Sequence, residues 1–429
     1  MKKSKKSVVA LAKETTIQES VTKVFDLLGG VTKMIDAGDT VVLKPNAGHA
    51  MGPESSVCTN PEVLRAIIRE VRKAQPKSIV IAEAAAIGCD TDECYDVSGI
   101  RAMANEEGVE CIDIKKDKDL LTIPVRGYKS NIKRVKYPRF MLEADHIINV
   151  PILKAHASMV FSGALKNIKG VVQDAVHMQM HQQNLAMAMM DVWYATRADI
   201  NIMDMWNPAG GFGPHTPVPL HVGCIAGSYD PVAIDRIACE VVGIDANLVD
   251  YFKTAEEAEY GTSDLDQIEV VGNTVEECYK KMWIPYVGGM NRWPEYNICR
   301  EGACSSCQAM LSLNMETLKA IGAYDKNKDK VIVIGSKNDD NIPKDIPGNK
   351  LILHGNCTKK YLKEHPDALW IKGCPPGEAC MYQTVAYDKL MDARPEVIPE
   401  MRAGMAEDHE VWEEYVKREA DRFYGALEK

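Results

Sequence analysis

The sequence lacks the long apolar runs and the surplus of basic residues that would place it in a membrane or on nucleic acid. None of its apolar runs reaches the roughly eighteen residues that a transmembrane helix needs. Lysine and arginine number 51 against 61 aspartates and glutamates, so the net charge is −10. Because no basic surplus is available to neutralise phosphates, we exclude a general nucleic-acid binder.

Signals for export and for dinucleotide binding are also missing. The start, MKKSKKSVVALAKE, is basic, but its apolar stretch is short and is interrupted at Lys13, unlike a signal peptide. No glycine fingerprint for a dinucleotide follows the first strand-like runs, which disfavours a nicotinamide-binding Rossmann domain. We therefore expect a cytoplasmic protein without a membrane segment.

What the chain does have, over its first 275 residues, is a repeated unit of an apolar β-branched run, a polar turn and a helical pattern. A helix-like segment at 59–74 follows the first run and places its apolar residues on one face. Such alternation predicts an α/β fold with a mostly parallel sheet and helices on both faces. The apolar runs lie at residues 39–46, 77–84, 144–156, 198–208 and 221–231.

A second, smaller α/β unit follows a connector at 280–300 that is rich in proline, glycine and aromatic residues. The segment SSCQAMLSLNMETLKAIGA is helical in pattern, and the end of the chain is a charged amphipathic helix. Because 429 residues exceed one ordinary core, several domains are expected. We expect an α/β domain at 1–280, a cysteine-rich α/β domain at 281–394 and a helical tail at 395–429. Strands of the smaller domain are expected at 330–335, 350–357 and 368–376.

The thirteen cysteines are unevenly distributed, and the last six lie close together in the sequence. Those of the first 280 residues are scattered and read as small buried hydrophobic side chains. Disulfides are disfavoured in the cytosol, so they do not explain why the last six cysteines lie close together. It comprises Cys299, Cys304, Cys307, Cys357, Cys374 and Cys380.

A convergent set of thiolates suits either zinc or a [4Fe–4S] cluster, and unliganded thiols are a third possibility. The presence of one Cys-x2-Cys pair, where structural zinc sites usually have two, favours the cluster. Pro375 and Pro376 favour it too, because they stiffen the loop after a cysteine. We expect the cluster ligands to be Cys304, Cys307, Cys357 and Cys374, with Cys299 and Cys380 as spares.

Polar side chains end the strand-like runs of the large domain. Lys44 follows the first run, Glu83 the second, and Lys154 with His156 the third. Ligands of open α/β sheets bind outside the carboxyl ends of strands, so these residues predict a site there. Lys166 lies shortly after, in the small, glycine-bounded stretch SGALKNIKG, whose backbone a ligand could approach closely. The alternative is a solvated helix face with ordinary capping.

Three stretches resemble the domain-of-unknown-function-362 family. They are LKPNAGHAMGPESSVCTNPEVLRAIIREV, ADHIINVPILKAHASMVFSGALKNIKGVV and GSYDPVAIDRIACEVVG, and they cover roughly residues 35–245. The cysteine-bearing part is similar to a cluster-binding tail of some members. The resemblance implies iron–sulfur proteins of mostly anaerobic organisms, but it does not imply a single reaction.

A weaker similarity links the chain to lactate racemases that carry a nickel-pincer nucleotide. His156 precedes Lys166 by ten residues within SGALK, as a histidine precedes the cofactor lysine in those enzymes. The resemblance implies Lys166 as the cofactor lysine and His156 as an acid or base. The sequence departs from that pattern at Gly163-Ala164, where the racemases have two glycines, and the racemases lack the cysteine tail.

These features favour an iron–sulfur oxidoreductase of an anaerobe in which the cluster is an electron relay. Lys44, Lys154 and Lys166 would hold a small anionic substrate, His156 would move a proton, and Glu83 completes the candidate catalytic set. The alternatives are an open-site iron–sulfur hydro-lyase, a nickel-pincer racemase or epimerase, and a non-catalytic electron carrier or cluster scaffold. A ferredoxin-like redox partner and a homodimer fit this picture, and a flavin stays open because no short motif reports one.

Overall fold

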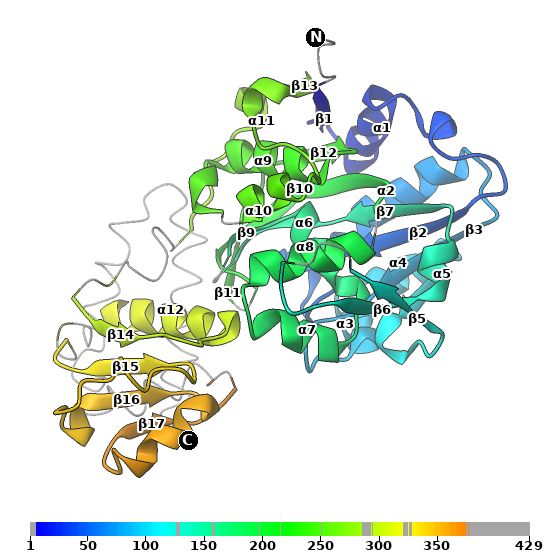
Figure 1. Ribbon diagram of the computed structural model, residues 1–429. Coiled ribbons are helices and arrows are strands. Elements are labelled where there is room, and N and C mark those ends of the chain that lie inside the picture. Colours follow the sequence, from blue (N-terminus) through cyan, green and yellow to red (C-terminus); the bar gives the residue numbers. More distant parts are fainter. Residues whose placement is uncertain are drawn as a thin grey trace, which may run out of the picture. The chain divides into compact units, whose positions relative to one another are not determined.

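The computed structural model divides the chain into two compact units, which are described separately (Figure 1). The first unit comprises Met1–Met180 and Leu185–Ile284, and the second comprises His181–Asn184 and Pro285–Lys429. The expected tail at 395–429 and Cys380 lie outside the described residues. The structure describes residues 6–125, 129–156, 159–196, 198–214, 216–249, 251–284, 293, 295–320, 325, 328–374 and 376.

An 11-stranded sheet forms the centre of the first unit. Its main path runs in the order β13-β1-β12-β10-β7-β2-β3-β4, with β8 and β11 branching from β10 and β9 pairing with β8. The strands are β1 (Ser7–Ala12), β2 (Thr40–Pro45), β3 (Ser78–Glu83), β4 (Glu110–Asp113), β7 (His146–Val150), β8 (Ile152–His156), β9 (Val160–Ser162), β10 (Ile200–Phe212), β11 (Thr216–Pro219), β12 (Cys224–Ser228) and β13 (Ile268–Gly272).

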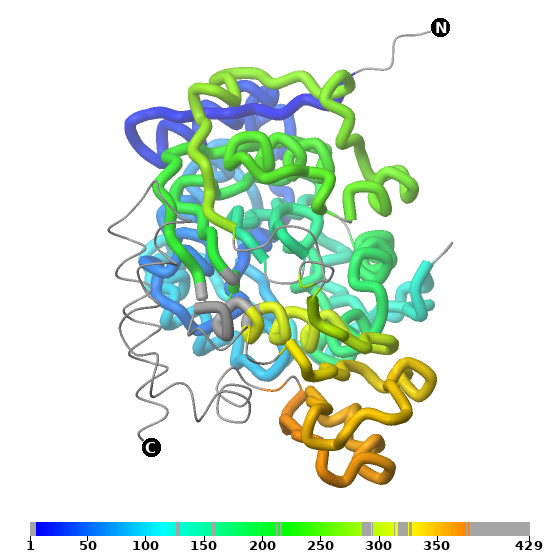
Figure 2. The backbone as a smooth tube through the Cα atoms, turned by 90° about the vertical axis from the view of Figure 1, so that its left-hand side faces the viewer, coloured from blue at the N-terminus to red at the C-terminus, as the bar shows by residue number. Residues whose placement is uncertain are grey.

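The sheet is rich in parallel pairs but mixed. The ladders among β4, β3, β2, β7 and β10 are parallel, whereas β12 is antiparallel to both β1 and β10. At the far edge, β1 and β13 lie side by side in parallel although they come from the two ends of the unit (Figure 2). The expected α/β class is confirmed, and the antiparallel β12 is a feature that the apolar runs did not predict.

Helices cover both faces of the sheet. Alternate strand residues, such as Leu43, Ile148 and Val150, share an apolar cluster with α1, α2 and α4 on one face. Asn149 lies between two of those residues and faces the other way, where its side chain donates to the Ala164 carbonyl of α6. The helices are α1 (Ile17–Leu27), α2 (Pro61–Arg72), α3 (Thr91–Val97), α4 (Ile100–Glu106), α5 (Arg139–Glu143), α6 (Ala164–Asn167), α7 (Asp174–His181), α8 (Leu185–Ala195), α9 (Pro231–Val242), α10 (Tyr251–Glu257) and α11 (Val275–Cys278).

Local sequence explains where α2 begins and which face it buries. The side chain of Asn60 accepts from the Glu62 amide, and Pro61 takes the first helical position, where its missing N–H is harmless. Leu64, Ile67 and their apolar neighbours then form the buried stripe. The structure places this helix at Pro61–Arg72, inside the range that the sequence pattern indicates.

The run expected as one strand at 144–156 is divided into β7 and β8. Pro151 separates the two strands, and it has no amide hydrogen to donate to a ladder. Strand β7 pairs with β2 and β10, whereas β8 pairs with a later part of β10 and with β9. The break therefore directs Lys154 and His156 away from the main path of the sheet.

The second unit contains a parallel sheet in the order β14-β15-β16-β17. Its apolar core includes Val333 and Leu353 from the two central strands. In the described part of the chain, no helix combines the length and the apolar character that crossing a membrane requires. The elements of the second unit are β14 (Asn297–Cys299), α12 (Ser305–Ala320), β15 (Val331–Ile334), β16 (Leu351–His354), the 3-10 helix η10 (Asn356–Lys363) and β17 (Leu369–Ile371). The first unit also contains a separate antiparallel hairpin of β5 (Leu120–Pro124) and β6 (Arg134–Pro138).

Candidate functional site

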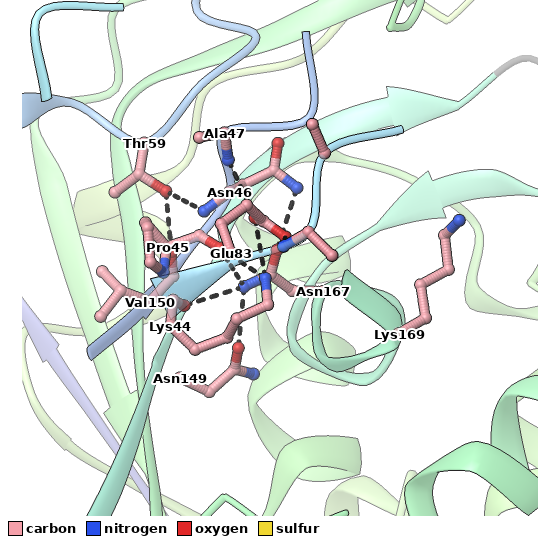
Figure 3. Close-up of polar contacts among 12 residues, drawn as sticks. Lys44, Pro45, Asn46, Ala47, Thr59, Glu83, Asn149, Val150, Asn167 and Lys169 are labelled. Carbon is pink, nitrogen blue, oxygen red and sulfur yellow. Dashed lines mark hydrogen bonds and ion pairs between the residues drawn. The ribbon is translucent and has the colours of Figure 1, made fainter. Parts of the chain in front are cut away.

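Lys44 and Glu83 form a buried ion pair at the carboxyl ends of β2 and β3 (Figure 3). The Lys44 Nζ donates to Glu83 Oε2 at 2.9 Å and to the Pro45 carbonyl at 2.6 Å. The backbone amides of Ala47 and Ala84 donate to the same carboxylate. The two side chains are 0% and 2% exposed, so this pair is closed within the protein.

Burial acts on the two charges in opposite directions. It lowers the pKa of Lys44 and raises the pKa of Glu83, and the attraction between the two groups opposes both shifts. Gly170 lies directly over the pair, since a Cβ there would stand 2.2 Å from Glu83 Oε1 and 2.9 Å from Lys44 Nζ. Direct contact of Lys44 or Glu83 with a substrate stays a prediction, and the observed contacts suit a positioning role.

A row of polar side chains crosses the sheet beside this pair. In the strand ladders, Lys44 is the partner of Asn149, Asn149 of Asn201, and Asn201 of Ser228. All four are fully buried. The amide of Asn149 donates to Asn201 Oδ1 at 2.9 Å, and Asn201 donates to the Ser228 carbonyl. Buried polar groups are costly unless they are paired. The hydrogen bonds of this row therefore favour the observed register between the neighbouring strands.

Asn167 joins the row to the lysine-bearing segments. Its Nδ2 donates to Asn149 Oδ1 at 2.8 Å, and its Oδ1 accepts from Asn46 Nδ2 at 2.9 Å. Asn46 in turn accepts from Lys154 Nζ at 2.8 Å, and Lys154 also donates to the Val57 carbonyl at 2.8 Å. One network of side chains therefore connects β2, β7, β8 and α6, and Figure 3 shows its part around Asn46, Asn149 and Asn167.

Three further lysines, Lys154, Lys166 and Lys169, make up what we call the lysine cluster. Burial lowers the pKa of Lys154 and of Lys169 to about 8, and it lowers the pKa of Lys166 well below its usual value. Repulsion from Lys169 and Lys154 lowers the pKa of Lys166 further. Figure 3 shows the Lys169 side chain extending away from the Lys44–Glu83 pair.

The lysine cluster lacks carboxylate partners. Within the described ranges, no group accepts a hydrogen bond from Lys166 Nζ or from Lys169 Nζ. Lys166 is nevertheless only 8% exposed. The charge of Glu83 acts on Lys154 and Lys169, but that carboxylate is already paired with Lys44. Buried cations are unfavourable unless their charge is matched, so this arrangement is suited to an anion.

His156 ends β8, two residues after Lys154. Side chains two apart on a strand share a face, so the strand presents both on the same side. The His156 Nδ1 accepts from the Met159 amide at 3.3 Å. Nδ1 of the imidazole therefore already accepts a hydrogen bond from the backbone three residues later.

The residue that positions Lys166 was missed by the sequence reasoning. Asp235 of α9 accepts from the backbone amides of Ala164 and Leu165, at the start of the short helix α6 that carries Lys166. Burial raises the pKa of Asp235 to about 7. Gly163 leaves space for this contact, because a Cβ there would stand 2.2 Å from Asp235 Oδ1. An aspartate inside the apolar run PVAIDRIACEVV is the signal that could have identified it.

In the second unit, the four cysteines expected as cluster ligands lie near one another. We call Cys304, Cys307, Cys357 and Cys374 the cysteine set. The thiol of Cys307 and the nearby backbone amides lower the pKa of Cys304 to about 6. The charges of Cys304, Cys357 and Cys374 all raise the pKa of Cys307, which shows that the four sulfurs are close enough to interact.

Gly355 packs against the cysteine set. A Cβ at this position would stand 3.3 Å from the Cys307 sulfur and 3.8 Å from the Cys357 sulfur. Over the residues that the structure describes, no three His, Cys, Asp or Glu side chains are placed to hold one metal ion. The spare Cys299 is buried in β14 and donates to the Asn341 carbonyl at 3.1 Å, which gives it a structural contact.

Two solved structures match the chain with low similarity. The lactate racemase apoprotein from Thermoanaerobacterium thermosaccharolyticum is 15% identical, with a TM-score of 0.33 over 53% of this chain and 57% of that chain. A protein from Thermotoga maritima is 17% identical, with a TM-score of 0.32 over 52% and 57%. The chain thus matches just over half the length of each, and neither similarity bears on the chemistry of this site.

Two sequence comparisons concern the first unit. A thylakoid-associated protein of Synechocystis sp. is 24% identical over 237 residues, which are 53% of this chain and 70% of that protein. The model of the family described as "Domain of unknown function (DUF362)" matches residues 41–240. That range contains the Lys44–Glu83 pair and the whole lysine cluster, so the similarity to the DUF362 family covers the part of the chain that carries this site.

Proposed function

We propose that this protein is an iron–sulfur-dependent oxidoreductase that acts on a small anionic substrate bound at the lysine cluster. The observation that carries the proposal is that buried Lys166 and partly exposed Lys169 have no acceptor for their ammonium groups among the described residues. An anion would supply the missing counter-charge and the missing hydrogen-bond acceptors together. This explains why the fold maintains buried cations beside an already satisfied ion pair.

The substrate class follows from the donors. Ammonium groups offer compact point charges that suit a carboxylate or a phosphate. Lys154 is already engaged by Asn46 and by the Val57 carbonyl, so it would contribute charge more than new hydrogen bonds. Lys166 and Lys169 would make the direct contacts, and Asn167 would orient them through α6.

His156 would act as the acid or base. An imidazole changes its protonation near neutral pH, which suits proton transfer to or from a carbon or oxygen atom next to the anionic group. Its place on the same face of β8 as Lys154 supports this role. Exchange of the proton with solvent follows from the partial exposure of His156.

The cysteine set would hold a [4Fe–4S] cluster, which supplies or accepts single electrons when bound. The four sulfurs influence one another electrostatically, yet they are not arranged for a single ion. A cluster binds one thiolate at each iron and so spreads its ligands more widely than one ion does, and Gly355 leaves room beside two of the sulfurs. A ferredoxin-like partner would then exchange electrons with the protein.

Metal analysis tests the cluster. Protein purified without oxygen is expected to contain about four irons and four acid-labile sulfides per chain. Cys307→Ser should reduce both contents, whereas Cys299→Ser, a matched control with a structural contact, should retain them. Zinc without sulfide, or equal loss in the two variants, would contradict this part of the proposal.

Anion titration tests the site in the first unit. Inorganic phosphate and malonate are suitable probes in isothermal titration calorimetry, and at least one should bind to the full chain. Lys169→Gln should weaken that binding about tenfold, a change of about 1.4 kcal/mol. Lys116→Gln changes an exposed lysine paired with Asp92 and should leave the affinity unchanged. Equal affinity in all three proteins would refute an anion site at the lysine cluster.

A nickel-pincer racemase or epimerase is the second candidate, favoured by the low pKa of Lys166. An amine is nucleophilic once it has lost its proton, and a lowered pKa eases that loss, so Lys166 suits covalent attachment of a cofactor. Intact mass spectrometry of protein from its native source would then show an added mass at Lys166.

Two other outcomes would favour the remaining alternatives. A bound cluster without anion binding would favour an electron carrier or a cluster scaffold. An anion that changes the visible spectrum of the oxidised cluster would favour the hydro-lyase.

A further inference from the structure

Two cysteines of the first unit, expected from the sequence to be inert hydrophobic residues, form a polar group with a histidine. Cys89 lies in the loop after β3 and Cys94 in α3. The Cys89 sulfur is 3.6 Å from Nδ1 of His49, which lies in the loop after β2. A hydrogen bond from the Cys94 thiol also reaches Cys89.

Backbone contacts keep these two loops together. The Ala86 amide donates to the Gly48 carbonyl at 3.0 Å, and the Cys89 amide donates to the Ala86 carbonyl at 3.0 Å. The Lys115 Nζ donates to the carbonyls of Ala86 and Cys89 at 2.9 and 3.0 Å. These backbone hydrogen bonds therefore hold Cys89 and His49 in a defined position relative to each other.

The surroundings favour a thiolate at Cys89. The Cys94 thiol, His49 and Lys115 lower the pKa of Cys89 to about 4, and Lys115 Nζ is itself 2.8 Å from Asp174 Oδ1. Burial and the neighbouring Cys89 raise the pKa of Cys94. Cys89 is partly exposed, whereas Cys94 is fully buried. One sulfur is therefore reactive and reachable, and the other is protonated and protected.

We propose that Cys89 and Cys94 are a dithiol–disulfide site that reacts with a low-molecular-weight disulfide, Cys89 being the attacking thiolate and Cys94 the resolving thiol. The proposal stands on the contacts of Cys89 with His49 and Cys94. It rests on neither the iron–sulfur cluster nor the anion site.

The exchange balances in two steps. The Cys89 thiolate attacks one sulfur of the disulfide R–S–S–R, forming a mixed disulfide and releasing R–S⁻. Cys94 then transfers its proton to that thiolate, giving R–SH, and its sulfur attacks the Cys89 sulfur. The second R–S⁻ leaves as the Cys89–Cys94 disulfide forms. The two protein thiols lose two electrons, and the small disulfide gains them.

Two comparisons within the same unit give the proposal its controls. Cys111 is also partly exposed, but burial raises its pKa to about 11, so it is nearly all protonated at neutral pH. Cys224 and Cys278 are a second pair joined by a thiol hydrogen bond, but both are fully buried. Only the Cys89–Cys94 pair among these combines a low pKa with access.

The experiment treats the reduced full chain with oxidised glutathione at pH 7, without oxygen, followed by alkylation and peptide mapping. We expect a Cys89–Cys94 disulfide and no glutathione retained at Cys89 in the wild type. Cys94→Ser, or Cys94→Ala as a second variant, should trap glutathione on Cys89. In the Cys94→Ser protein, where a hydroxyl still stands beside Cys89, Cys89 should react more than about tenfold faster than Cys111.

His49→Gln tests the activating contact. It should slow the trapping reaction of the Cys94→Ser protein most strongly at pH 6, where a normal thiol is scarcely ionised. The proposal is overturned if Cys89 reacts no faster than Cys111, or if neither Cys94 variant retains glutathione. These readouts are independent of iron content and anion affinity, so they separate this inference from the proposed function.

Discussion

Lys44 and Lys166 are two buried lysines of the same domain with opposite surroundings. Lys44 donates to Glu83 and to the Pro45 carbonyl, and its charge is compensated inside the protein. Lys166 has no acceptor in the described part of the chain, and two other lysines raise the cost of its charge. The first lysine thus serves the fold, while the second makes sense when something from outside binds to it.

The largest expected effect comes from breaking the compensated pair. Lys44→Met leaves Glu83 buried without its cation, which should lower the free energy of unfolding by about 3–5 kcal/mol. Lys44→Met combined with Glu83→Leu removes both charges and should recover most of that loss. Urea unfolding of the full chain, followed by circular dichroism, measures both variants.

An exposed pair is the control for this prediction. Arg139 and Asp119 lie on the surface, with their side chains 43% and 66% exposed. Arg139→Gln should leave the unfolding midpoint unchanged, because solvent screens such pairs. If Lys44→Met behaved like Arg139→Gln, the Lys44–Glu83 pair would not be the internal support that its burial indicates.

The glycine above the pair should give the next largest effect. Gly170→Ala places a methyl group against Glu83 Oε1 and Lys44 Nζ, so either the pair or the backbone must move. Overpacking of this kind costs about 1–3 kcal/mol. Gly48→Ala is the matched control, because its nearest neighbour would be 3.9 Å from the new Cβ. Comparable unfolding midpoints for the two alanine variants would show that the pair tolerates displacement.

Burial patterns explain how much of this could be predicted from the sequence. The run at 77–84 and the helix at 59–74 correspond to β3 and α2, because apolar periodicity reports burial along the chain. Periodicity does not report which strands pair or in which direction. The sequence therefore does not predict the antiparallel placement of β12, nor strand β1, whose short apolar stretch follows a basic start.

The site shows the same limit. Lys44, Glu83, Lys154 and Lys166 were identifiable because charged residues stand at the ends of apolar runs. Their division into a closed pair and an uncompensated cluster depends on contacts between segments that lie far apart in sequence. The role of Cys89 could not be predicted, because its partner His49 comes from another loop. In a sequence, a cysteine that contacts a histidine looks the same as a buried, inert cysteine.

A smaller effect should appear in the pH dependence of stability. Lys154 has a pKa of about 8 in the folded protein against a usual 10.5, so between these values the unfolded chain binds more protons. Stability conferred by this residue should therefore rise with pH from 8 to 10.5, with a slope of at most about 1.4 kcal/mol per pH unit. The difference in unfolding free energy between the wild type and Lys154→Met isolates this slope from other titrations. A difference that is flat, or that falls with pH, would show that burial does not lower the pKa of Lys154 in the folded protein.

The smallest expected effect on stability is the most informative for function. Lys166→Met keeps most of the length of the side chain and removes a buried charge that has no partner, so the unfolding midpoint should stay the same or rise slightly. The same substitution at Lys44 should be strongly destabilising, although both lysines are buried. A Lys166→Met protein that is stable but no longer binds phosphate or malonate would show that the site holds its charge for a ligand. Marked destabilisation would mean instead that Lys166 belongs to the fold, and that the contrast between the two lysines is wrong.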